Sequence, residues 1–521
     1  MNPTAQIAMN WWALSPIIIV LGTGAVQVLL EAFLPEMARR PFQIVTSLLA
    51  IIAAFVMATL NFRDLPQQSV PIAGGELLLD WVGTFAVLIL LVLGALSVLV
   101  FADRSSQLDG AFAAQPADRP GSADEHLSIT KQYQRTEIFP LMMFSLGGMM
   151  VFVQATSLLT LFVALEVMSL PLYILAASAR RARLISQEAG MKYFLLGAFA
   201  SAFFLMGSAL FFLMFGMVNV TAIRADVVIQ FAQSKDAGAL VLFVLAVLMI
   251  LVGLLFKVAA VPFHAWTPDV YQGAPSPVTG FMAAGVKVAA FLAIIRVLHS
   301  VSIGVFPGMR ASLWIIAALT IIYGTVMGLR QTDVKRMLAY SSIAHAGFIL
   351  TALTGQNGIF SGTVSSILFY LLTYGIATVG AFAIITLVRD RDEQGNITGE
   401  ATNMTRWNGL AKESPLLAVS MTIFLLSFAG IPLTAGFMGK FWLFSDAVRI
   451  GAVPLVILAV LASAATAVFY FRLIRNMFFY ERDDRSVVVA SEGFALFAIA
   501  FSALATVLLG IMPTLVINLL S

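Results

Sequence analysis

Cysteine is missing from this chain of 521 residues. Its absence excludes disulfides, thiolate metal sites and cysteine-ligated iron-sulfur clusters, so redox chemistry at such centres must take place in another chain. Charge is scarce as well, because charged residues make up 11% of the chain and hydrophobic residues 60%, with a mean hydropathy of +0.95. This composition excludes an ordinary soluble protein and predicts an all-α polytopic membrane protein.

Two further absences narrow the possible ligands. The net charge is only +3 and the basic residues are spread through many loops, so the chain lacks the basic patch that nucleic acid requires. The four histidines are scattered without a pair at helical spacing, which argues against haem. We therefore expect no cofactor, no metal and no nucleic acid on this chain. The first apolar run starts near Trp11 without a basic segment before it, and it predicts a retained helix rather than a cleaved signal.

Fourteen apolar segments have about the length of roughly 20 residues that crosses a bilayer. They lie at about 12–33, 41–61, 79–102, 138–154, 156–178, 187–217, 238–262, 276–298, 311–329, 334–353, 362–388, 415–446, 452–478 and 492–518.

The fourth to eighth spans and the ninth to thirteenth spans form two sets of five, over residues 138–298 and 311–478. Because five is odd, the second set crosses the membrane in the opposite sense, which predicts an inverted repeat. Three spans within residues 1–102 precede the two sets, and one span at 492–518 follows them. The polar stretch 103–137 predicts a mobile cytoplasmic loop, to which we assign no chemistry.

Lysine and arginine are distributed unevenly between the loops. With the four intramembrane lysines left out, the loops after odd-numbered spans hold 20 of these residues and the other loops hold six. The positive-inside rule then predicts that the basic loops are cytoplasmic and that both termini lie on the outer side of the membrane.

The four intramembrane lysines are the most informative residues of the chain. Lys192, Lys257, Lys287 and Lys440 fall inside apolar segments, whereas all 22 arginines lie in loops or in the last turns of segments. Both side chains carry positive charge, but only lysine can release its proton at accessible pH. The partition indicates a protein that moves protons.

Two of these lysines lie beside predicted helix breaks. Lys257 precedes VPFHAWTPDVYQGAPSP and Lys440 follows SFAGIPLTAGFMG, each four residues after a glycine, Gly253 or Gly436. Proline removes backbone donors, and the freed carbonyls are tolerated at membrane depth only where they line a polar cavity. Those carbonyls can solvate an ammonium group, although Lys257 could also extend to the membrane interface.

Lys287 lies about 16 Å from either end of its span, at 1.5 Å per residue, and cannot easily reach water. Glu166 lies in the middle of its own span, and its expected partner is Lys257. A change in the distance between the two would then switch the protonation of the lysine. A neutral, structural Glu166 is the alternative.

Two candidates remain open between a functional and a structural role. Lys192 begins its span close to the basic loop, so it could relay protons or simply extend to the interface. His345, in the tenth span, could relay a proton near neutral pH or serve as a hydrogen-bonded core residue.

Three stretches resemble a known family: LLFKVAAVPFHAWTPDVYQGAPSPVTGFMAAGVK, TDVKRMLAYSSIAHAGF and AGIPLTAGFMGKFWLF. They are similar to the antiporter-like membrane subunits of bacterial NADH:quinone oxidoreductase, respiratory complex I. The likeness covers spans four to thirteen. Lys440 stands where M-type subunits have Glu, and the chain lacks the long lateral helix of L-type subunits, so the resemblance is to the N-type.

The resemblance implies that Glu166 is the coupling acid, Lys257 its partner, Lys287 the central relay and Lys440 the terminal lysine, with His345 able to bridge the last gap. The resemblance also implies that flavin and iron-sulfur clusters reside in partner subunits and that quinone is a substrate of the whole complex. It further implies that the chain lies in the bacterial plasma membrane, beside other membrane and peripheral subunits. The subunits of an Mrp-type cation/proton antiporter or of a membrane-bound hydrogenase remain alternatives. A purely structural scaffold would not need lysines at the bilayer centre.

Overall fold

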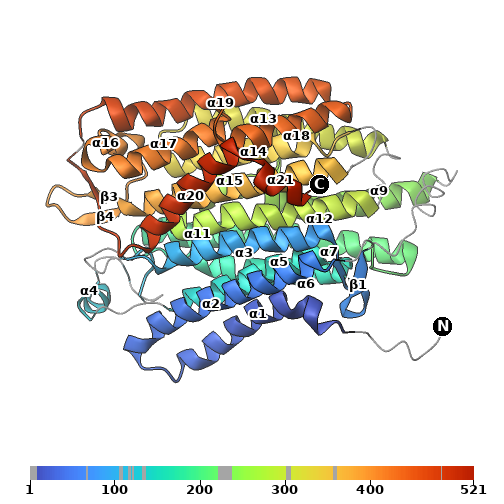
Figure 1. The fold of residues 1–521 in the computed structure, drawn as a ribbon, viewed down its shortest axis with the longest axis horizontal. Coiled ribbons are helices and arrows are strands. Elements are labelled where there is room, and N and C mark those ends of the chain that lie inside the picture. The colour runs from blue at the N-terminus through green and yellow to red at the C-terminus, as the bar shows by residue number, and fades with distance from the viewer. Residues whose placement is uncertain are drawn as a thin grey trace.

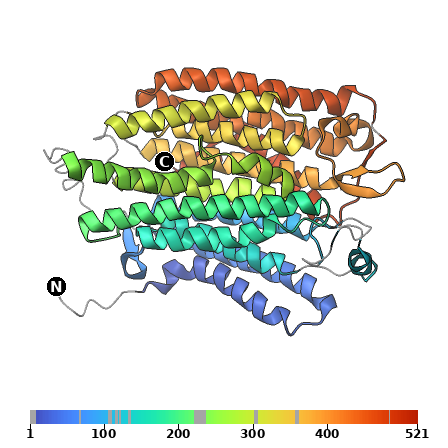
Figure 2. The same cartoon turned by 180° about the vertical axis from the view of Figure 1, so that it is seen from behind.

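The computed structural model describes residues 9–65, 69–104, 110–114, 119, 122–131, 136–220, 237–300, 307–355, 361–482 and 484–520. Its helices run side by side in one bundle (Figure 1). One end of the bundle, which we call the basic end, holds α4 (Ala123–Thr130), β3 (Val388–Arg391), β4 (Ile397–Glu400) and α16 (Leu410–Glu413). The strand β1 (Val70–Ile72) lies at the other end. Figure 2 shows the opposite face, where α7 (Arg183–Phe215) and α9 (Ala237–Val258) pack side by side. Eleven helices in the described ranges are long and apolar enough to cross a membrane, and two shorter helices are also apolar. This is a multi-pass membrane protein.

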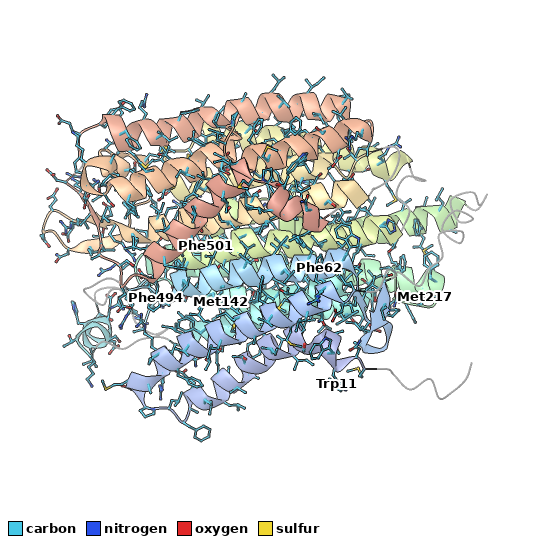
Figure 3. All side chains as sticks on the ribbon, in the orientation of Figure 1. Trp11, Phe62, Met142, Met217, Phe494 and Phe501 are labelled. Carbon is cyan, nitrogen blue, oxygen red and sulfur yellow. The ribbon has the colours of Figure 1, made fainter. Side chains whose placement is uncertain are left out.

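A small hairpin connects the second and third helices. The bounds of these first elements are α1 (Trp11–Glu31), α2 (Glu36–Arg63), β1 (Val70–Ile72), β2 (Leu77–Leu79) and α3 (Trp81–Ala102). Asp80 caps α3, because its side chain accepts a hydrogen bond from the Gly83 amide. The same carboxylate forms a bidentate ion pair of 2.8 and 2.9 Å with the buried guanidinium of Arg296. Figure 3 shows the exposed Trp11 at the same end of the bundle as this hairpin, where an interfacial aromatic anchor is expected.

The first set of five spans contains one interrupted helix. Its elements are α5 (Ile138–Gln154), α6 (Leu158–Ala176), α7 (Arg183–Phe215), α9 (Ala237–Val258), α10 (Trp266–Gly273), α11 (Ser276–Phe281), the π-helical turn η2 (Met282–Val286) and α12 (Lys287–Ser300). The helix α9 ends where Ala259 adopts a left-handed φ of 64°. A residue with a Cβ rarely takes this conformation, so the surrounding structure must hold the break in place.

The second set contains the other interrupted helix. Its elements are α13 (Pro307–Leu329), α14 (Val334–Thr351), α15 (Ser361–Leu387), β3 (Val388–Arg391), β4 (Ile397–Glu400), η4 (Met404–Trp407), α16 (Leu410–Glu413), α17 (Pro415–Ala429), α18 (Ala435–Arg449) and α19 (Val453–Phe479). Between α17 and α18, Gly430 and Leu433 both have a positive φ, of 81° and 71°. Each set therefore has its break in the fourth span, immediately beside a lysine. The chain ends with β5 (Ser486–Val488), α20 (Phe494–Ile511) and α21 (Thr514–Leu520).

The two glycines that precede these lysines have a packing role. A Cβ at Gly253 would come within 2.7 Å of the Cβ of Phe204 in α7, and a Cβ at Gly436 would come within 2.0 Å of the Ser427 carbonyl oxygen. Both glycines thus permit a close approach that any side chain would block. They hold the interrupted helices against their neighbours.

The predicted helical architecture with interrupted helices is confirmed, and every predicted span contains a helix. Two details were wrong, and the described pieces of one loop have structure of their own. The chain also forms two small antiparallel sheets, β1–β2 and β4–β3–β5. The last span ends at Ile511 rather than at 518, because Pro513 cannot donate the backbone hydrogen bond that would continue the helix. The described parts of loop 103–137 include a helix, α4 (Ala123–Thr130), and the buried residues Ala111–Ala113.

This loop is attached to the bundle through its backbone. The Ala113 amide donates to the Ser178 carbonyl (2.9 Å), and the Arg180 amide donates to the Ala111 carbonyl (2.9 Å). Phe112 forms an isolated β-bridge with Ala179. Polarity predicted a mobile loop, but in this short described piece the apolar residues pack against the connection between α6 and α7.

A buried ion pair joins the two sets of helices at the basic end. Glu400, in β4, accepts hydrogen bonds from Lys335 Nζ at the start of α14 (2.8 Å) and from the Ser276 amide and hydroxyl at the start of α11 (3.0 and 2.7 Å). Burial alone would raise the pKa of this carboxyl, but the positive charges of Lys335 and Arg389 and the hydrogen bonds outweigh burial and lower the pKa below its usual value. The ionised carboxylate therefore stabilises the fold.

Glu400→Gln is expected to lower the free energy of unfolding by about 1–3 kcal/mol, the contribution of hydrogen bonds to a charged group. Because the folded pKa lies below the unfolded one, this contribution is present at neutral pH and is lost as the pH falls through the folded pKa. Melting curves by intrinsic tryptophan fluorescence should show a lower melting temperature for the variant at pH 7. The difference in melting temperature from wild type should disappear at acidic pH. Glu393→Gln is the control, since the Glu393 side chain is 89% exposed on the same hairpin. A difference in melting temperature that does not change with pH would contradict the stabilising role of the ionised Glu400 carboxylate.

Candidate functional site: a buried line of lysines

Four of the predicted site residues are enclosed in the bundle. Lys257, Lys287 and His345 are each 2% exposed and Lys440 is 5% exposed. They come from α9, α12, α14 and α18 respectively. Among the described residues, no carboxylate oxygen lies within 4.0 Å of the three lysine nitrogens. Hydroxyl and carbonyl oxygens surround them instead, so each lysine is solvated by neutral groups.

Lys257 lies in a pocket of aromatic rings at the end of α9. Its Nζ donates to the hydroxyls of Ser169 (2.8 Å) and Tyr173 (3.4 Å), both on α6. The ring centroids of Tyr173, Tyr193 and Phe256 lie 5.4 to 5.5 Å from the same nitrogen. Rings at this distance attract a cation through their faces, which makes the ammonium form tolerable in a buried site.

Glu166 does not contact Lys257 directly. It lies on α6 three residues before Ser169, and its Oε1 is buried without a hydrogen-bond partner in the described structure. The two charges nevertheless interact electrostatically. The sequence suggested a direct pair, whereas the structure places the Ser169 hydroxyl on the lysine. An unpartnered buried oxygen is costly, and a water or a moving side chain would relieve it.

Lys287 connects the broken helix α9 to α14. Its Nζ donates to the carbonyl of Val258 (3.1 Å), the last residue of α9, and to the carbonyl of Ser342 (2.9 Å). The last four carbonyls of any helix have no partner within that helix, so the break at Ala259 supplies an acceptor at membrane depth. Val258 follows Lys257 directly in the chain, so one peptide unit joins the two lysine sites.

His345 lies between two tyrosine hydroxyls. Its Nδ1 is 2.6 Å from the Tyr370 hydroxyl on α15, and its Nε2 is 3.4 Å from the Tyr470 hydroxyl on α19. The Tyr470 hydroxyl is also hydrogen-bonded to Ser341. A neutral imidazole has one donor and one acceptor nitrogen, and each hydroxyl can play either role. The arrangement can therefore pass a proton in either direction by exchanging donors and acceptors.

Lys440 binds carbonyls at the second helix break, as Lys287 does at the first. Its Nζ donates to the carbonyls of Phe428 (2.7 Å) and Ala429 (3.1 Å), the last two residues of α17, and to the Ser463 hydroxyl (2.7 Å) on α19. Gly430 lets the chain turn away so closely that an added Cβ would be 2.9 Å from the lysine Cδ. The free carbonyls of both interrupted helices thus bind lysine ammonium groups.

Lys192 lies apart from this line. Its side chain is 40% exposed, and its Nζ pairs with Glu188 (2.7 Å) and with Asp269 (2.6 Å). Asp269 in turn pairs with Arg336 at 2.7 Å. Lys192 therefore belongs to an ion-pair cluster at the surface between α7, α10 and α14.

Sequence reasoning missed the residues that link the lysines. Ser169, Tyr173, Tyr370 and Tyr470 carry the hydroxyls beside Lys257 and His345. One signal was available, because Glu166, Ser169 and Tyr173 recur at helical spacing and must share one face of α6. Tyr370 and Tyr470 come from distant helices, and only the packing shows them beside His345. Among the residues that the structure describes, no group of three or more histidines and carboxylates could hold a metal ion.

Comparisons with known proteins identify the family of this chain. The family model described as NADH:quinone oxidoreductase/Mrp antiporter, TM, matches residues 155–466, which contain every residue of the line. NADH-quinone oxidoreductase subunit N of Beutenbergia cavernae is 47% identical over 529 residues, covering 99% of this chain and 98% of the relative. The subunit N of Acidothermus cellulolyticus is also 47% identical, covering 99% and 97%.

Solved structures extend the likeness to the fold. A chain of respiratory complex I from Thermus thermophilus with bound aureothin is 31% identical, with a TM-score of 0.76, and the match covers 97% of this chain and 99% of that one. A chain of the Mrp complex from Dietzia has a TM-score of 0.78 at 20% identity, over 98% and 96%, which shows the shared fold alone. With close relatives over its full length, this chain belongs to the subunit N family of NADH-quinone oxidoreductase, within the antiporter-like membrane subunits.

Proposed function

We propose that this chain translocates protons along the line Glu166, Lys257, Lys287, His345 and Lys440, driven by NADH oxidation and quinone reduction in other subunits of the complex. The observation that carries the proposal is the solvation of Lys287 and Lys440 by carbonyls freed at helix breaks. Such a site can hold a lysine with or without its extra proton, because no fixed carboxylate pairs with it. Flavin and iron-sulfur clusters would reside in partner subunits, with quinone as a substrate of the whole complex.

The first step concerns Glu166 and Lys257. Ser169 hydrogen-bonds to Lys257 and lies one helical turn from Glu166 on α6. Approach of the ionised Glu166 would favour the ammonium form of Lys257, and its withdrawal would favour release of the proton. Because Glu166 Oε1 is buried without a hydrogen-bond partner, movement of this carboxylate toward a donor would lower its free energy. A charge change in a neighbouring subunit would control that movement.

The middle of the line passes through Lys287. A proton leaving Lys257 would reach Lys287 around the Val258 peptide, whose carbonyl Lys287 already binds. Lys287 also binds the carbonyl of Ser342, one helical turn before His345 on α14. Side chains or water must complete the connection, since carbonyls only accept hydrogen bonds.

The last part of the line runs from His345 to Lys440. Tyr370 is hydrogen-bonded to His345 and packs against Gly439, the neighbour of Lys440. Phe348 lies between the two sites, with its ring 5.2 Å from Lys440 Nζ. We propose that Tyr370 exchanges protons with His345, and that Lys440 passes the proton onward toward the outer side. Lys192 would stabilise the structure rather than relay protons.

The proposed setting is the bacterial plasma membrane, with the basic end in the cytoplasm and both termini on the outer side. The sets 138–298 and 311–478 would act as inverted repeats, each with one interrupted helix. Other membrane and peripheral subunits of complex I, together with lipid, would surround the chain. The exposed apolar side chains along α1, α7 and α19 support contact with lipid or with those subunits.

Native purification from the membrane tests the proposed role. We expect the chain to migrate with a flavin and iron-sulfur NADH dehydrogenase, and NADH to acidify the lumen of inverted vesicles in a way that a protonophore abolishes. A sodium flux driven by a gradient in vesicles without NADH would instead support an Mrp-type antiporter. Co-migration with a hydrogenase would instead support a role as a subunit of a membrane-bound hydrogenase.

A further inference from the structure

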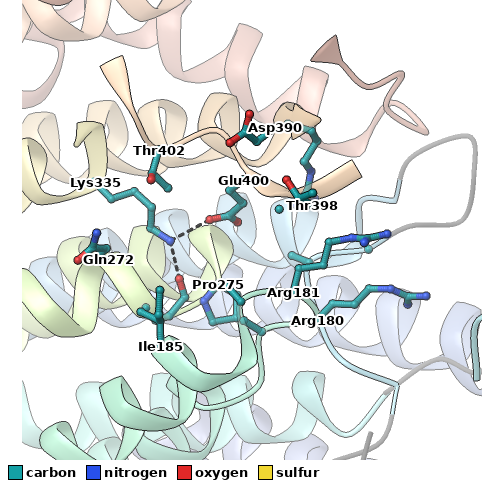
Figure 4. Close-up of a pocket in the computed structure, with 18 residues that line it drawn as sticks. Arg180, Arg181, Ile185, Gln272, Pro275, Lys335, Asp390, Thr398, Glu400 and Thr402 are labelled. Carbon is teal, nitrogen blue, oxygen red and sulfur yellow. Dashed lines mark hydrogen bonds and ion pairs between the residues drawn. The ribbon is translucent and has the colours of Figure 1, made fainter. Parts of the chain in front are cut away.

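A pocket of about 200 Å³ opens at the basic end, away from the line of lysines. Its walls come from the α6–α7 connection, the α10–α11 turn, the start of α14, and strands β3 and β4. Figure 4 shows Lys335 and Glu400 bonded to each other at one side, while Arg180 and Arg181 extend away from Lys335. The pocket thus touches elements of both helix sets.

The lining carries four cations, Arg180, Arg181, Lys335 and Arg389, and two anions, Asp390 and Glu400. Both anions already have cationic partners. Glu400 binds Lys335, and Asp390 forms an ion pair of 3.0 Å with Arg406. Neither carboxylate therefore forms an ion pair with Arg389.

Arg389 is the unusual residue of the set. It is only 4% exposed, yet among the described residues its guanidinium makes no side-chain hydrogen bond and no ion pair within 4.0 Å. Its interaction with Glu400 is electrostatic and longer in range. Buried charges are normally paired, because removing a charge from water without compensation is costly.

The backbone prevents Arg389 from leaving this position. Residue 389 lies in the central strand β3, where it pairs with Glu400 on one side and with Val487 on the other. The side chain must therefore find a partner within the pocket, and a guanidinium matches oxyanions through its planar pair of donors. Thr398 and Thr402 also line the pocket.

We propose that this pocket binds a phosphate group, with Arg389 as its principal ligand and Arg180 and Arg181 as its charged rim. The planar pair of donors on the Arg389 guanidinium matches the oxygens of a phosphate group. The group belongs either to free inorganic phosphate or to an anionic lipid headgroup, since the pocket opens at the end of the bundle. A bound phosphate would link the α10–α11 turn of the first helix set to the β3–β4 hairpin of the second.

The test uses the purified whole complex in two arms. In the first arm, equilibrium dialysis measures the binding of labelled inorganic phosphate to wild type and to Arg389→Gln. In the second arm, nanodiscs of phosphatidylglycerol or of phosphatidylcholine are compared by native mass spectrometry for lipid retained on this chain. We expect Arg389→Gln to lose one phosphate-containing ligand per chain, with binding at least about tenfold weaker in one arm.

Arg485→Gln is the matched control, because Arg485 is 60% exposed beside the same sheet and is absent from the pocket lining. It should bind like wild type. Loss in the first arm identifies free phosphate as the ligand, and loss in the second identifies a lipid headgroup. Equal binding by wild type and Arg389→Gln in both arms overturns the proposal, as does an equal loss in Arg485→Gln.

A second substitution keeps the test decisive if Arg389→Gln does not assemble. Arg389→Lys keeps the charge but removes the planar fork of donors, so binding about 3- to 10-fold weaker than wild type is expected. Unchanged binding in Arg389→Lys means that the fork contacts no phosphate, and it also overturns the proposal.

Discussion

Lys287→Ala is expected to reduce NADH-driven proton translocation by about tenfold or more, equivalent to at least about 1.4 kcal/mol in the barrier. Alanine reaches neither the Val258 nor the Ser342 carbonyl, so the substitution removes the proton carrier and leaves two buried acceptors without their partner. Inverted membrane vesicles with a pH-sensitive dye measure the translocation. NADH oxidation with an artificial electron acceptor should continue, because that chemistry takes place in other subunits.

Lys287→Arg separates the loss of the proton from the loss of the charge. Arginine can donate to the same carbonyls, but it does not release its proton at accessible pH, so pumping should remain low while assembly is retained. Lys412→Ala is the control, since Lys412 is exposed at the basic end in α16. Full pumping by Lys287→Ala would remove Lys287 from the proposed line. Full pumping by Lys287→Arg would mean that charge at this position, and not proton release, is what the protein needs.

The positions of the buried lysines could be predicted because membrane burial is a strong constraint. A lysine such as Lys287, far from both ends of an apolar segment, must be buried or reach water through the protein. Proline and glycine beside Lys257 and Lys440 likewise predicted the two helix breaks, since proline removes a backbone donor wherever it occurs. These signals come from residues that are neighbours in the chain, so a single sequence is enough to recognise them.

The partners of the lysines could not be predicted in the same way. His345 meets Tyr370 and Tyr470, which are 25 and 125 residues away in the chain, and only the packing of α14, α15 and α19 brings the three together. Lys335 gave a misleading signal. It is one of the 20 basic residues assigned to the loops after odd-numbered spans, yet its side chain is 1% exposed beside Glu400. Its place depends on the β3–β4 hairpin, whose four-residue strands are too short to give a clear alternating pattern.

Gly430→Ala is expected to impair pumping although it leaves every ionisable group of the line in place. A Cβ at this position would lie 2.9 Å from Lys440 Cδ and 3.3 Å from Nζ, so the lysine must move away from the Phe428 and Ala429 carbonyls. The φ of 81° adds about 1–2 kcal/mol of backbone strain for a residue with a Cβ. We expect pumping in vesicles to fall by about threefold or more, toward the low level expected for Lys440→Ala.

Gly395→Ala separates backbone strain from the crowding of Lys440. Gly395 has a similar φ of 85°, but an added Cβ there would meet nothing within 4 Å. The two variants therefore share the strain of a left-handed alanine and differ in whether the new methyl group reaches the lysine. Gly395→Ala should pump like wild type. If the two variants lose pumping equally, strain alone accounts for the effect; if neither loses it, the contacts of Lys440 with the end of α17 do not control proton transfer. A loss confined to Gly430→Ala would mean that the carbonyls freed at the helix break must hold the Lys440 ammonium in place for pumping.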